Sequence, residues 1–467
     1  MSIASMRFVT AVCTCVLAGA GVAPQLHAAD TASAPRAISL TDAIAYAREH
    51  QPQLRVALER MKAQEAQAQI ARARWLPSVG LTGQLFGATA NNTTASYVST
   101  SLVDLPRIGG TRVLSAGRFS PYASSLVGVG ATQELFDFGR IAAAAAVDDA
   151  LVDAQRSRAQ AALLDVTFNV EEAYFAVLAA HAIVDAATGA YERSLVHRDL
   201  AKAGVDAGLR SPIELTRAQA DLENFAVGEQ QARGGLALAQ SAFAAVTGVS
   251  DAALDAAGEP QAPADLPALS DALRQAAARD PAILELLAQL QADELKTRAI
   301  ASELRPDLSL TATVSGRAGG APPSGNGRAA LADGFVPDVV NWDLGVVFTW
   351  PLFDATVGAR KAASLADAQV RRAELASARY QQAAAIRAAY LAVDVARMAL
   401  PARKRAVQAA QANHAQADAR FRAGLGTSVE LADAEALREQ AEVQLAVGQF
   451  ELARARAAFG RAIAEGL

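Results

Sequence analysis

The sequence predicts a mixed α/β membrane protein that consists mostly of long α-helices and contributes four β-strands per chain. Three observations lead to this fold class. Roughly a quarter of the 467 residues are alanine, whereas aromatic residues make up only 5%. The second half of the chain repeats the order of motifs found in the first half. Two segments of each half alternate between apolar and polar residues, as strands with one apolar face do.

The composition favours closely packed helices over a large aromatic core, because alanine is the best helix former and lets helix axes approach each other. The formal net charge is −5 and the basic residues are spread along the chain, so no nucleic-acid partner is expected. Both cysteines, Cys13 and Cys15, lie in an apolar run near the N-terminus. Disulfides and thiol chemistry are therefore not expected in the mature chain.

The first residues form a predicted signal peptide over residues 1–29. Arg7 precedes an apolar run that small residues follow, which is typical of secretory signals, and cleavage after Ala28, Ala29 or Ala34 fits this pattern. The residues before Cys13 make a poor lipoprotein cleavage site. Beyond the signal, no apolar run approaches the roughly 18 residues of a membrane-spanning helix. Any passage through a bilayer must then be made by strands.

An internal duplication divides the mature chain into repeat 1 at residues 30–250, a proline-rich linker at 251–268 and repeat 2 at 269–467. The matching motifs keep their order, with offsets that change only once by 12 to 13 residues. They are Leu40-Thr41-Asp42-Ala43 with Leu269-Ser270-Asp271-Ala272, Leu135-Phe136-Asp137 with Leu352-Phe353-Asp354, and Ala207-Gly208-Leu209 with Ala423-Gly424-Leu425.

Each repeat is expected to contain a helix, two strands, a very long helix, a tight turn and a returning helix. No proline occurs from Gly139 to Asp206, which at 1.5 Å per residue allows a helix of about 100 Å. The partner helix over residues 355–421 contains Pro401, which should kink it or mark a bulge. The flanking helices, over about 40–76 and 212–247, together match one long helix in length. Paired antiparallel rods of this kind form the wall of a cylinder.

The strand before the second long helix carries a continuous apolar face. Its apolar residues alternate with polar or small ones and are Trp342, Leu344, Val346, Phe348, Trp350 and Leu352. Trp342 and Trp350 would lie about 20 Å apart along a tilted strand, close to the separation of the two aromatic girdles of a membrane barrel. Four strands cannot close a barrel, and a membrane tolerates no open strand edge, so several chains must share one. Two chains give a packed interior, whereas three give 12 strands and a lumen.

These doubled motifs resemble the TolC family of outer-membrane efflux proteins over essentially the whole mature chain. The resemblance implies a homotrimer with a shared 12-stranded barrel in the outer membrane of a Gram-negative cell and an α-helical tunnel through the periplasm. It further implies a passive exit duct, contacts with outer-membrane lipid, and partnership with a periplasmic adaptor and an inner-membrane transporter. Two segments depart from the family pattern, Gln133-Glu134 before the first Leu-Phe-Asp motif and Ala355-Thr356-Val357 after the second.

The two helix turns have a structural interpretation and a functional one. Gly208 and Gly424 suit the positive φ at a helix end, while Ser211 and Thr427 can cap the next helix, with Glu214 and Glu430 completing a capping box. The functional interpretation follows from the resemblance, which places the adaptor contact at these turns. The residues in question are Gly208, Leu209, Ser211, Gly424, Leu425 and Thr427.

The resemblance also implies a periplasmic gate. Glu430 and Asp433 lie three residues apart on one helix face, so threefold symmetry would bring six carboxylates together at the narrow end of the tunnel. Arg210, Glu214 and Phe421 match positions where neighbouring helices are tied to each other. An arginine near the second turn helps to hold the family's entrance shut, but this chain has Gly426 there, which makes Arg210 the candidate substitute.

Enzymatic motifs are not expected. His27, His50, His181, His197 and His414 show no metal-ligand spacing, which favours helix-surface positions, and neither a cofactor nor a metal site is predicted. Asp137 and Asp354 fit helix caps.

A periplasmic coiled-coil adaptor without a membrane barrel is the alternative function, and a single-chain porin would need more strands. The cargo stays open between proteins and drugs; by analogy, the poor lipid-anchor site favours protein-secreting members.

Overall fold

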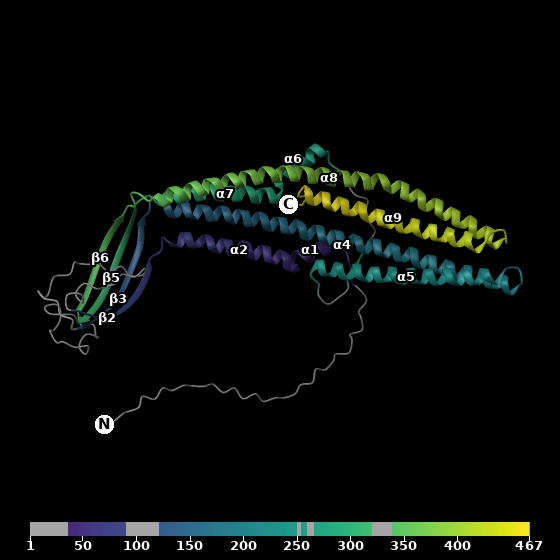
Figure 1. The fold of residues 1–467 in the computed structure, drawn as a ribbon, viewed down its shortest axis with the longest axis horizontal. Coiled ribbons are helices and arrows are strands. Elements are labelled where there is room, and N and C mark those ends of the chain that lie inside the picture. The colour runs from purple at the N-terminus through teal and green to yellow at the C-terminus, as the bar shows by residue number, and fades with distance from the viewer. Residues whose placement is uncertain (1–35, 90–120, 250–253, 259–265, 320–338, 467) are drawn as a thin grey trace, which may run out of the picture.

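The computed structural model describes residues 36–89, 121–249, 254–258, 266–319 and 339–466. These residues form a long layer of helices with a four-stranded sheet at one end (Figure 1). The predicted signal peptide at 1–29 lies outside the described residues. The elements are β1 (Arg36–Ile38), α1 (Leu40–His50), α2 (Pro52–Ala73), β2 (Ser78–Thr89), β3 (Pro121–Phe136), α4 (Arg140–Asp206), α5 (Pro212–Thr247), β4 (Leu254–Ala256), α6 (Leu269–Arg279), α7 (Pro281–Ser302), β5 (Asp307–Gly319), β6 (Val339–Thr349), α8 (Ala355–Arg422) and α9 (Ser428–Ala462).

The predicted fold class and internal duplication are confirmed. Both halves run through two short helices, two strands, one long helix and one returning helix. The duplication extends to the cores, where Tyr174 meets Phe243 and Tyr390 meets Phe459, each pair edge to face with ring centroids 5.8 Å apart. Phe243 and Phe459 are both fully buried. The exact residue boundaries of the two repeats stay a prediction.

The helix expected over residues 40–76 was wrong, because the structure has two helices there. Gln51 separates α1 from α2 with an extended ψ of 119°. In the second repeat, Asp280 separates α6 from α7 with ψ 116°. Each of these residues precedes a proline, whose ring disfavours the helical conformation of its predecessor. Pro52 and Pro281 thus start a new helix in each repeat.

The two long helices have the predicted extent. α4 contains 67 residues and α8 contains 68, and α8 runs through Pro401 without ending. A proline in a helix removes one backbone hydrogen bond and bends the helix axis. In Figure 1, α8 bows gradually along its length.

One expectation about membrane-spanning helices needs correction. α4 contains an 18-residue stretch that is apolar enough to cross a membrane by length and composition. Alanine explains the difference, since it raises the mean hydropathy of a helix without adding large side chains. In the structure α4 packs against α2, α5, α7 and α9.

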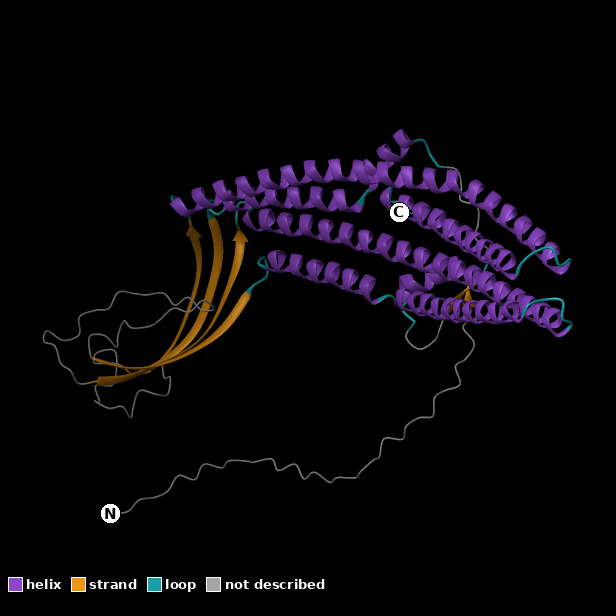
Figure 2. Ribbon diagram, turned by 45° about the vertical axis from the view of Figure 1, so that its right-hand side comes forward, coloured by secondary structure: helices purple, strands orange, loops and turns teal. Residues whose placement is uncertain are grey.

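The helices form one layer with two open edges. α4 packs against α2 and α5 on one side and against α7 and α9 on the other, and α8 packs against α7 and α9. Figures 1 and 2 show α2 and α5 end to end along α4, and α7 and α9 end to end along α8. α8 therefore forms one edge of the layer, and α2 with α5 forms the opposite edge.

The sheet is antiparallel with the strand order β2-β3-β5-β6. Its register aligns one apolar row across all four strands, in which Leu81 pairs with Val129, Val129 with Val314, and Val314 with Trp342. All four of these side chains are exposed, Trp342 by 77%. The polar residues Thr82 and Thr313, on the opposite face, are buried. β2 and β6 are the two edge strands.

The predicted linker contains a strand that the sequence did not indicate. β4 pairs in parallel with β1 and aligns Arg36 with Leu254. Leu254 is buried in the core of repeat 1. The hydroxyl of Tyr174 also donates to the Ala257 carbonyl at 2.6 Å. Residues 254–258 of the linker are therefore packed against α4.

The core of repeat 1 yields the first prediction. Phe243→Ala should lower the free energy of unfolding by about 3–5 kcal/mol, because it leaves a cavity beside Tyr174. Thermal unfolding of the detergent-extracted protein, followed by helical circular dichroism, measures the loss. Leu209→Ala is the control, since Leu209 is 84% exposed. An unchanged midpoint for Phe243→Ala would contradict the packing described here.

Candidate functional site

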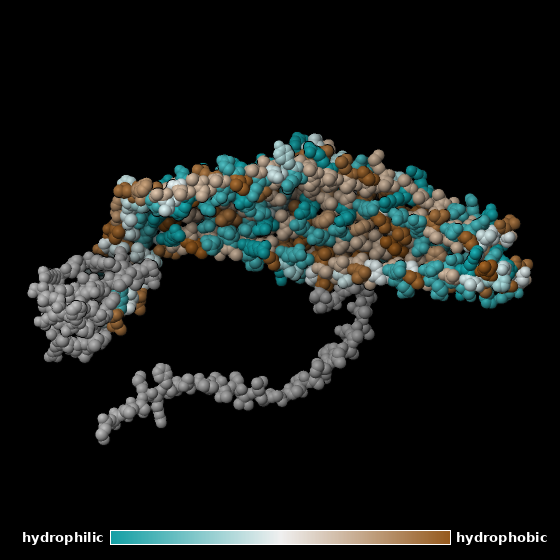
Figure 3. Space-filling view, viewed as in Figure 1, coloured by the Kyte–Doolittle hydropathy of each residue, from teal (hydrophilic) through white to brown (hydrophobic). Residues whose placement is uncertain are grey.

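The end of the layer opposite the sheet consists of two turns, one between α4 and α5 and one between α8 and α9. Gly208 has φ 69° and Gly424 has φ 74°, which is the left-handed conformation expected at these helix ends. Leu209 and Leu425 follow these glycines and are 84% and 74% exposed. Figure 3 shows apolar side chains in brown among polar ones at this end. Each of the two equivalent turns therefore presents one exposed leucine at this end of the layer.

The caps of the two following helices differ. Thr427 accepts a hydrogen bond from the Glu430 backbone N–H at 3.2 Å, as predicted. Ser211 occupies the N-cap position of α5, but its side chain makes no cap hydrogen bond. Glu214 also departs from the predicted capping box, because its carboxylate binds Arg210 at 2.6 Å. Arg210 competes successfully for this carboxylate because its guanidinium is a charged donor, whereas the backbone N–H of a capping box is a neutral one.

Arg210, Glu214 and Phe421 meet at the junction of the two repeats. The Arg210 guanidinium lies over the Phe421 ring with its carbon 3.7 Å from the ring centroid. It also donates to the Phe421 backbone carbonyl. Phe421 is only 1% exposed and belongs to a core cluster with Ala201, Ala218 and Leu431. The first turn thus holds the end of α8 through a cation–π contact and a hydrogen bond.

Glu430 and Asp433 lie apart from this junction on the exposed start of α9. The Glu430 carboxylate is 3.7 Å from Arg420, and both side chains are more than half exposed. Asp433 is exposed and faces Asp221 of α5. Burial raises the pKa of Asp221, and the nearby Asp433 raises it further against the opposing effect of Arg217. This surface therefore gathers the carboxylates of Glu430, Asp433 and Asp221, with Arg420 and Arg217 beside them.

Gly426 stands at the tightest point of the second turn. A Cβ at this position would lie 3.2 Å from the Arg420 Cβ, the Phe421 backbone nitrogen and the Glu430 carboxylate. The turn is therefore closed too tightly for a larger residue without local adjustment. Arg210 of the first turn makes the contact with Phe421 instead.

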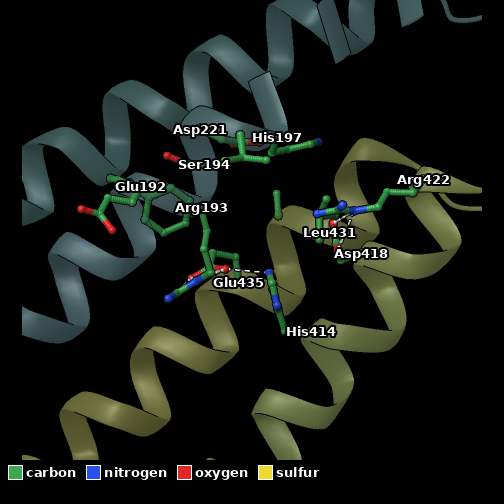
Figure 4. Close-up of a pocket in the computed structure, with 13 residues that line it drawn as sticks. Glu192, Arg193, Ser194, His197, Asp221, His414, Asp418, Arg422, Leu431 and Glu435 are labelled. Carbon is green, nitrogen blue, oxygen red and sulfur yellow. Dashed lines mark hydrogen bonds and ion pairs between the residues drawn. The ribbon is translucent and has the colours of Figure 1, made fainter. Parts of the chain in front are cut away.

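The sequence analysis missed a buried ion-pair cluster between the repeats. It lines a cavity of about 430 Å³ bordered by α4, α5, α8 and α9 (Figure 4). Arg193 of α4 donates from Nε and Nη2 to the Glu435 carboxylate of α9 at 2.7–2.9 Å. His414 of α8 contacts the same carboxylate at 2.8 Å. One carboxylate thus joins three helices and both repeats.

Burial opposes the charged form of Glu435, which is 4% exposed. The hydrogen bonds from His414 and Arg193 outweigh this effect and lower the pKa of Glu435. The neighbouring Glu439 has a raised pKa, first because of burial and then because of the Glu435 charge. Glu435 therefore stays ionised and holds Arg193 in place.

The histidines do not all lie on helix surfaces as expected. His197 is 6% exposed and its Nε2 shares a hydrogen bond of 3.2 Å with the Ser428 hydroxyl. His414 contacts Glu435, and His181 lies 2.6 Å from the Asp255 carboxylate. His50 and His181, whose side chain is 39% exposed, lie on helix surfaces as expected, while His27 lies outside the described residues. The sequence did contain a signal that relates His197 to His414. The two histidines are 217 residues apart, which is also the distance between Asp137 and Asp354 of the repeated Leu-Phe-Asp motif.

The remaining predicted positions concern caps, the girdle and metals. Asp354 caps α8 by accepting from Thr356 at 2.8 Å, and Asp137 accepts from the Gly139 N–H at 2.9 Å. Trp342 lies near the start of β6, whereas Trp350 follows its end and donates to the Leu304 carbonyl at 3.2 Å. The two tryptophans thus mark opposite ends of this strand. Within the described ranges, no group of three or more potential ligands could hold a metal ion.

The comparisons with known proteins agree with this architecture. The sequence profile described as "Outer membrane efflux protein" matches residues 43–249 and 272–465. Protein CyaE of Bordetella pertussis is 29% identical over 312 residues, which cover 64% of this chain and 61% of that protein. Fusaric acid resistance protein FusA of Burkholderia cepacia is 27% identical over 200 residues, or 42% and 36% of the two chains. The alignments thus span less than two thirds of either relative.

The fold is shared with solved structures. The CmeC outer membrane channel of Campylobacter jejuni superposes with a TM-score of 0.72 at 18% sequence identity. The superposition covers 92% of this chain and 86% of that one. Nearly the whole described architecture therefore has a counterpart in that structure.

The buried ion-pair cluster yields the second prediction. Glu435→Ala should destabilise the protein by about 3–5 kcal/mol, because Arg193 is left largely buried without a partner. Guanidinium titration in detergent measures the change. The control is Glu430→Ala, which removes an exposed carboxylate and should cost less than about 1 kcal/mol. Equal losses for the two variants would show that the cluster contributes no more than a surface ion pair.

Proposed function

The chain belongs to the outer membrane efflux protein family, and from this premise we propose that it is the outer-membrane exit duct of a tripartite export system. Three copies build a passive conduit that crosses the outer membrane as a β-barrel and the periplasm as a helical tunnel. The single observation that carries this proposal is the open sheet with one exposed apolar face, continuous with an open layer of long helices. Neither structure is complete in one chain.

The edges of the sheet favour assembly in a ring. β2 and β6 each present an outer row of backbone groups that no strand among the described residues pairs. In a bilayer such groups have no water to bind, so an open edge costs several kcal/mol per unpaired group. Pairing β6 of one copy with β2 of the next satisfies both edges. The oligomeric state is then determined by how many copies are needed to pair every strand edge in a closed ring.

The helical layer has matching edges. β6 leads into α8 and α2 leads into β2, so each sheet edge continues into the helix edge on the same side. Among the described residues, α8 leaves a set of apolar side chains exposed, namely Leu365, Val370, Tyr380, Leu391, Val395 and Met398. The opposite edge exposes Val56, Ile70, Val227 and Leu238. Joining these two edges buries both sets, as helix packing requires.

Three copies fit a conduit better than two. Two copies give 8 strands, whose barrel interior is just filled by side chains, whereas three give 12 strands and room for a lumen. The apolar row through Leu81, Val129, Val314 and Trp342 then faces lipid, and the polar residues face inward. Trp342 and Trp350 mark the two membrane interfaces as aromatic girdles, which anchor a barrel at headgroup level.

The tips are the proposed contact for a periplasmic adaptor. Leu209 and Leu425 present exposed apolar side chains at the end farthest from the sheet, together with Gly208, Ser211, Gly424 and Thr427. Helical hairpins of a partner can cover such leucines in a groove between helices. Energy for export comes from an inner-membrane transporter, because the sequence contains no phosphate-binding loop.

The gate is proposed at the same end. Glu430 and Asp433 of three copies place six carboxylates around the entrance, while Arg210, Glu214 and Phe421 hold neighbouring helices together. The passive duct itself catalyses no reaction in this proposal. Proteins and drugs both remain cargo classes for it; FusA, one relative, is named for fusaric acid resistance.

A periplasmic adaptor without a barrel is the second candidate function. The exposed apolar row of the sheet argues against it, since a water-soluble protein rarely leaves so wide an apolar surface uncovered. Val340, Trp342, Leu344, Val346 and Phe348 of one strand are all more than half exposed. A lipid-facing strand explains this surface directly.

The entrance carboxylates yield the third prediction, which tests the proposed function. In planar bilayers, the wild-type channel should be cation-selective and blocked by trivalent cations, because crowded carboxylates repel each other and attract cations. Glu430→Ala with Asp433→Ala should form pores of the same oligomeric state, weaken the selectivity and abolish the block.

Glu214→Ala is the matched control for this experiment. It releases Arg210 between helices, so it should raise conductance and leave selectivity unchanged. A double variant that keeps wild-type selectivity and block would place the constriction elsewhere. Failure of the wild-type protein to form pores would count against the exit duct itself.

A further inference from the structure

The ring of Phe421 contacts both a permanent cation and a group that can become one. Arg210 covers one face of the ring at 3.7 Å, and His197 meets the ring edge to face with centroids 4.7 Å apart. Phe421 and His197 are 1% and 6% exposed. The three residues come from α8, the first turn and α4. Through this contact, His197 and Arg210 of repeat 1 pack against Phe421 at the end of α8 in repeat 2.

The surroundings of His197 supply few compensating charges. From the first turn it faces Arg210, from α5 Glu214, and from α8 Asp418 and His414. From α9 it faces the neutral hydroxyl of Ser428. The other buried carboxylate nearby, Glu435, is already occupied by Arg193 and His414.

Burial is the main reason that the pKa of His197 is lowered. Arg210 lowers this pKa further, while Asp418 and Glu214 act in the opposite direction without reversing the shift. A second positive charge on His197, beside Phe421 and close enough to feel Arg210, is therefore unfavourable while the contact is closed. Neutral histidine fits this site, and imidazolium does not.

We propose that His197 is a further positioning residue of the closing contact around Phe421 and that its protonation loosens this contact in acid. The inference rests on the proposed function, because a looser contact opens the periplasmic end of the duct. Loosening frees the end of α8 from the first turn and lets the two helical hairpins separate. Opening exposes His197 to water.

The direction of the pH effect follows from linkage. In the open form His197 regains an ordinary pKa near 6.5, whereas the closed form holds the proton more weakly. The closed form is therefore fully favoured above that pH and loses stability as the pH falls below it. Each unit of difference between the two pKa values shifts the closed-to-open ratio by roughly tenfold.

Single-channel recordings at pH 7.5 and pH 5.5 test this inference with the full-length assembled channel. For the wild type, the fraction of time spent in the open state should rise at pH 5.5. His197→Gln keeps a polar group of similar reach but cannot be protonated, so its open fraction should not change between the two pH values. His197→Asn serves as a second uncharged variant.

Two histidine controls accompany these variants. His50→Gln changes an exposed histidine that stacks on Tyr46, and it should keep the wild-type pH response. His414→Gln should keep a pH response of the same direction, because His414 contacts Glu435 and not Phe421, although its charge also faces His197. A response that disappears in His414→Gln and persists in His197→Gln would overturn the assignment to His197.

A second measurement reports on the contact without a substitution at His197. Nitroxide labels on Leu209→Cys and Leu425→Cys place probes on the two turns, and pulsed dipolar spectroscopy gives their separation. The separation should increase at pH 5.5 in the chain that retains His197. Distances and open fractions that do not change with pH in the wild type would overturn the inference, although pores still form. A protein that forms no pores at either pH would instead overturn the proposed function, and the inference with it.

Discussion

Unpaired backbone groups at the edge of a membrane-embedded sheet cost several kcal/mol each, so the sheet of β2, β3, β5 and β6 depends on partners for its outer strands. The helical layer continues the same two edges, with α8 on one side and α2 with α5 on the other. The duplication fits this requirement, since two similar repeats side by side form a curved segment of a larger ring. Closing that ring satisfies the sheet and the helices together.

The two repeats are joined by different kinds of contact at the two ends of the molecule. Near the sheet, strand pairing between β3 and β5 joins the repeats. At the other end, buried polar contacts join them: Glu435 binds Arg193 across the repeats, and Arg210 holds Phe421. Buried charges respond to protonation, whereas apolar packing does not. In the proposed duct, contacts of this kind suit the end that closes and opens.

Local sequence patterns predicted most of the fold. The features that were not predicted depend mainly on contacts between residues far apart in the sequence. Three elements were predicted from residues close together in the sequence, and the structure contains all three. They are the long helix α4, from its lack of proline, the two turns, from their glycines, and the strand β6, from its alternation. Pro52 and Pro281 were visible too, but their effect on Gln51 and Asp280 was not considered. The pairing of β1 with β4 and the meeting of Arg193 with Glu435 depend on residues more than 200 positions apart, which no local pattern relates. Ser211 and Glu214 fitted a capping box locally, and Arg210 changed the outcome by binding Glu214.

The central claim is that this chain is complete only as a closed ring of three copies. Native mass spectrometry of the detergent-extracted protein tests it most directly, because the technique counts copies without relying on function. The account predicts a mass three times that of the mature chain, with no substantial monomer at concentrations well below those of purification. A stable monomer in detergent, or a dimer, would contradict the edge pairing on which the conduit is built.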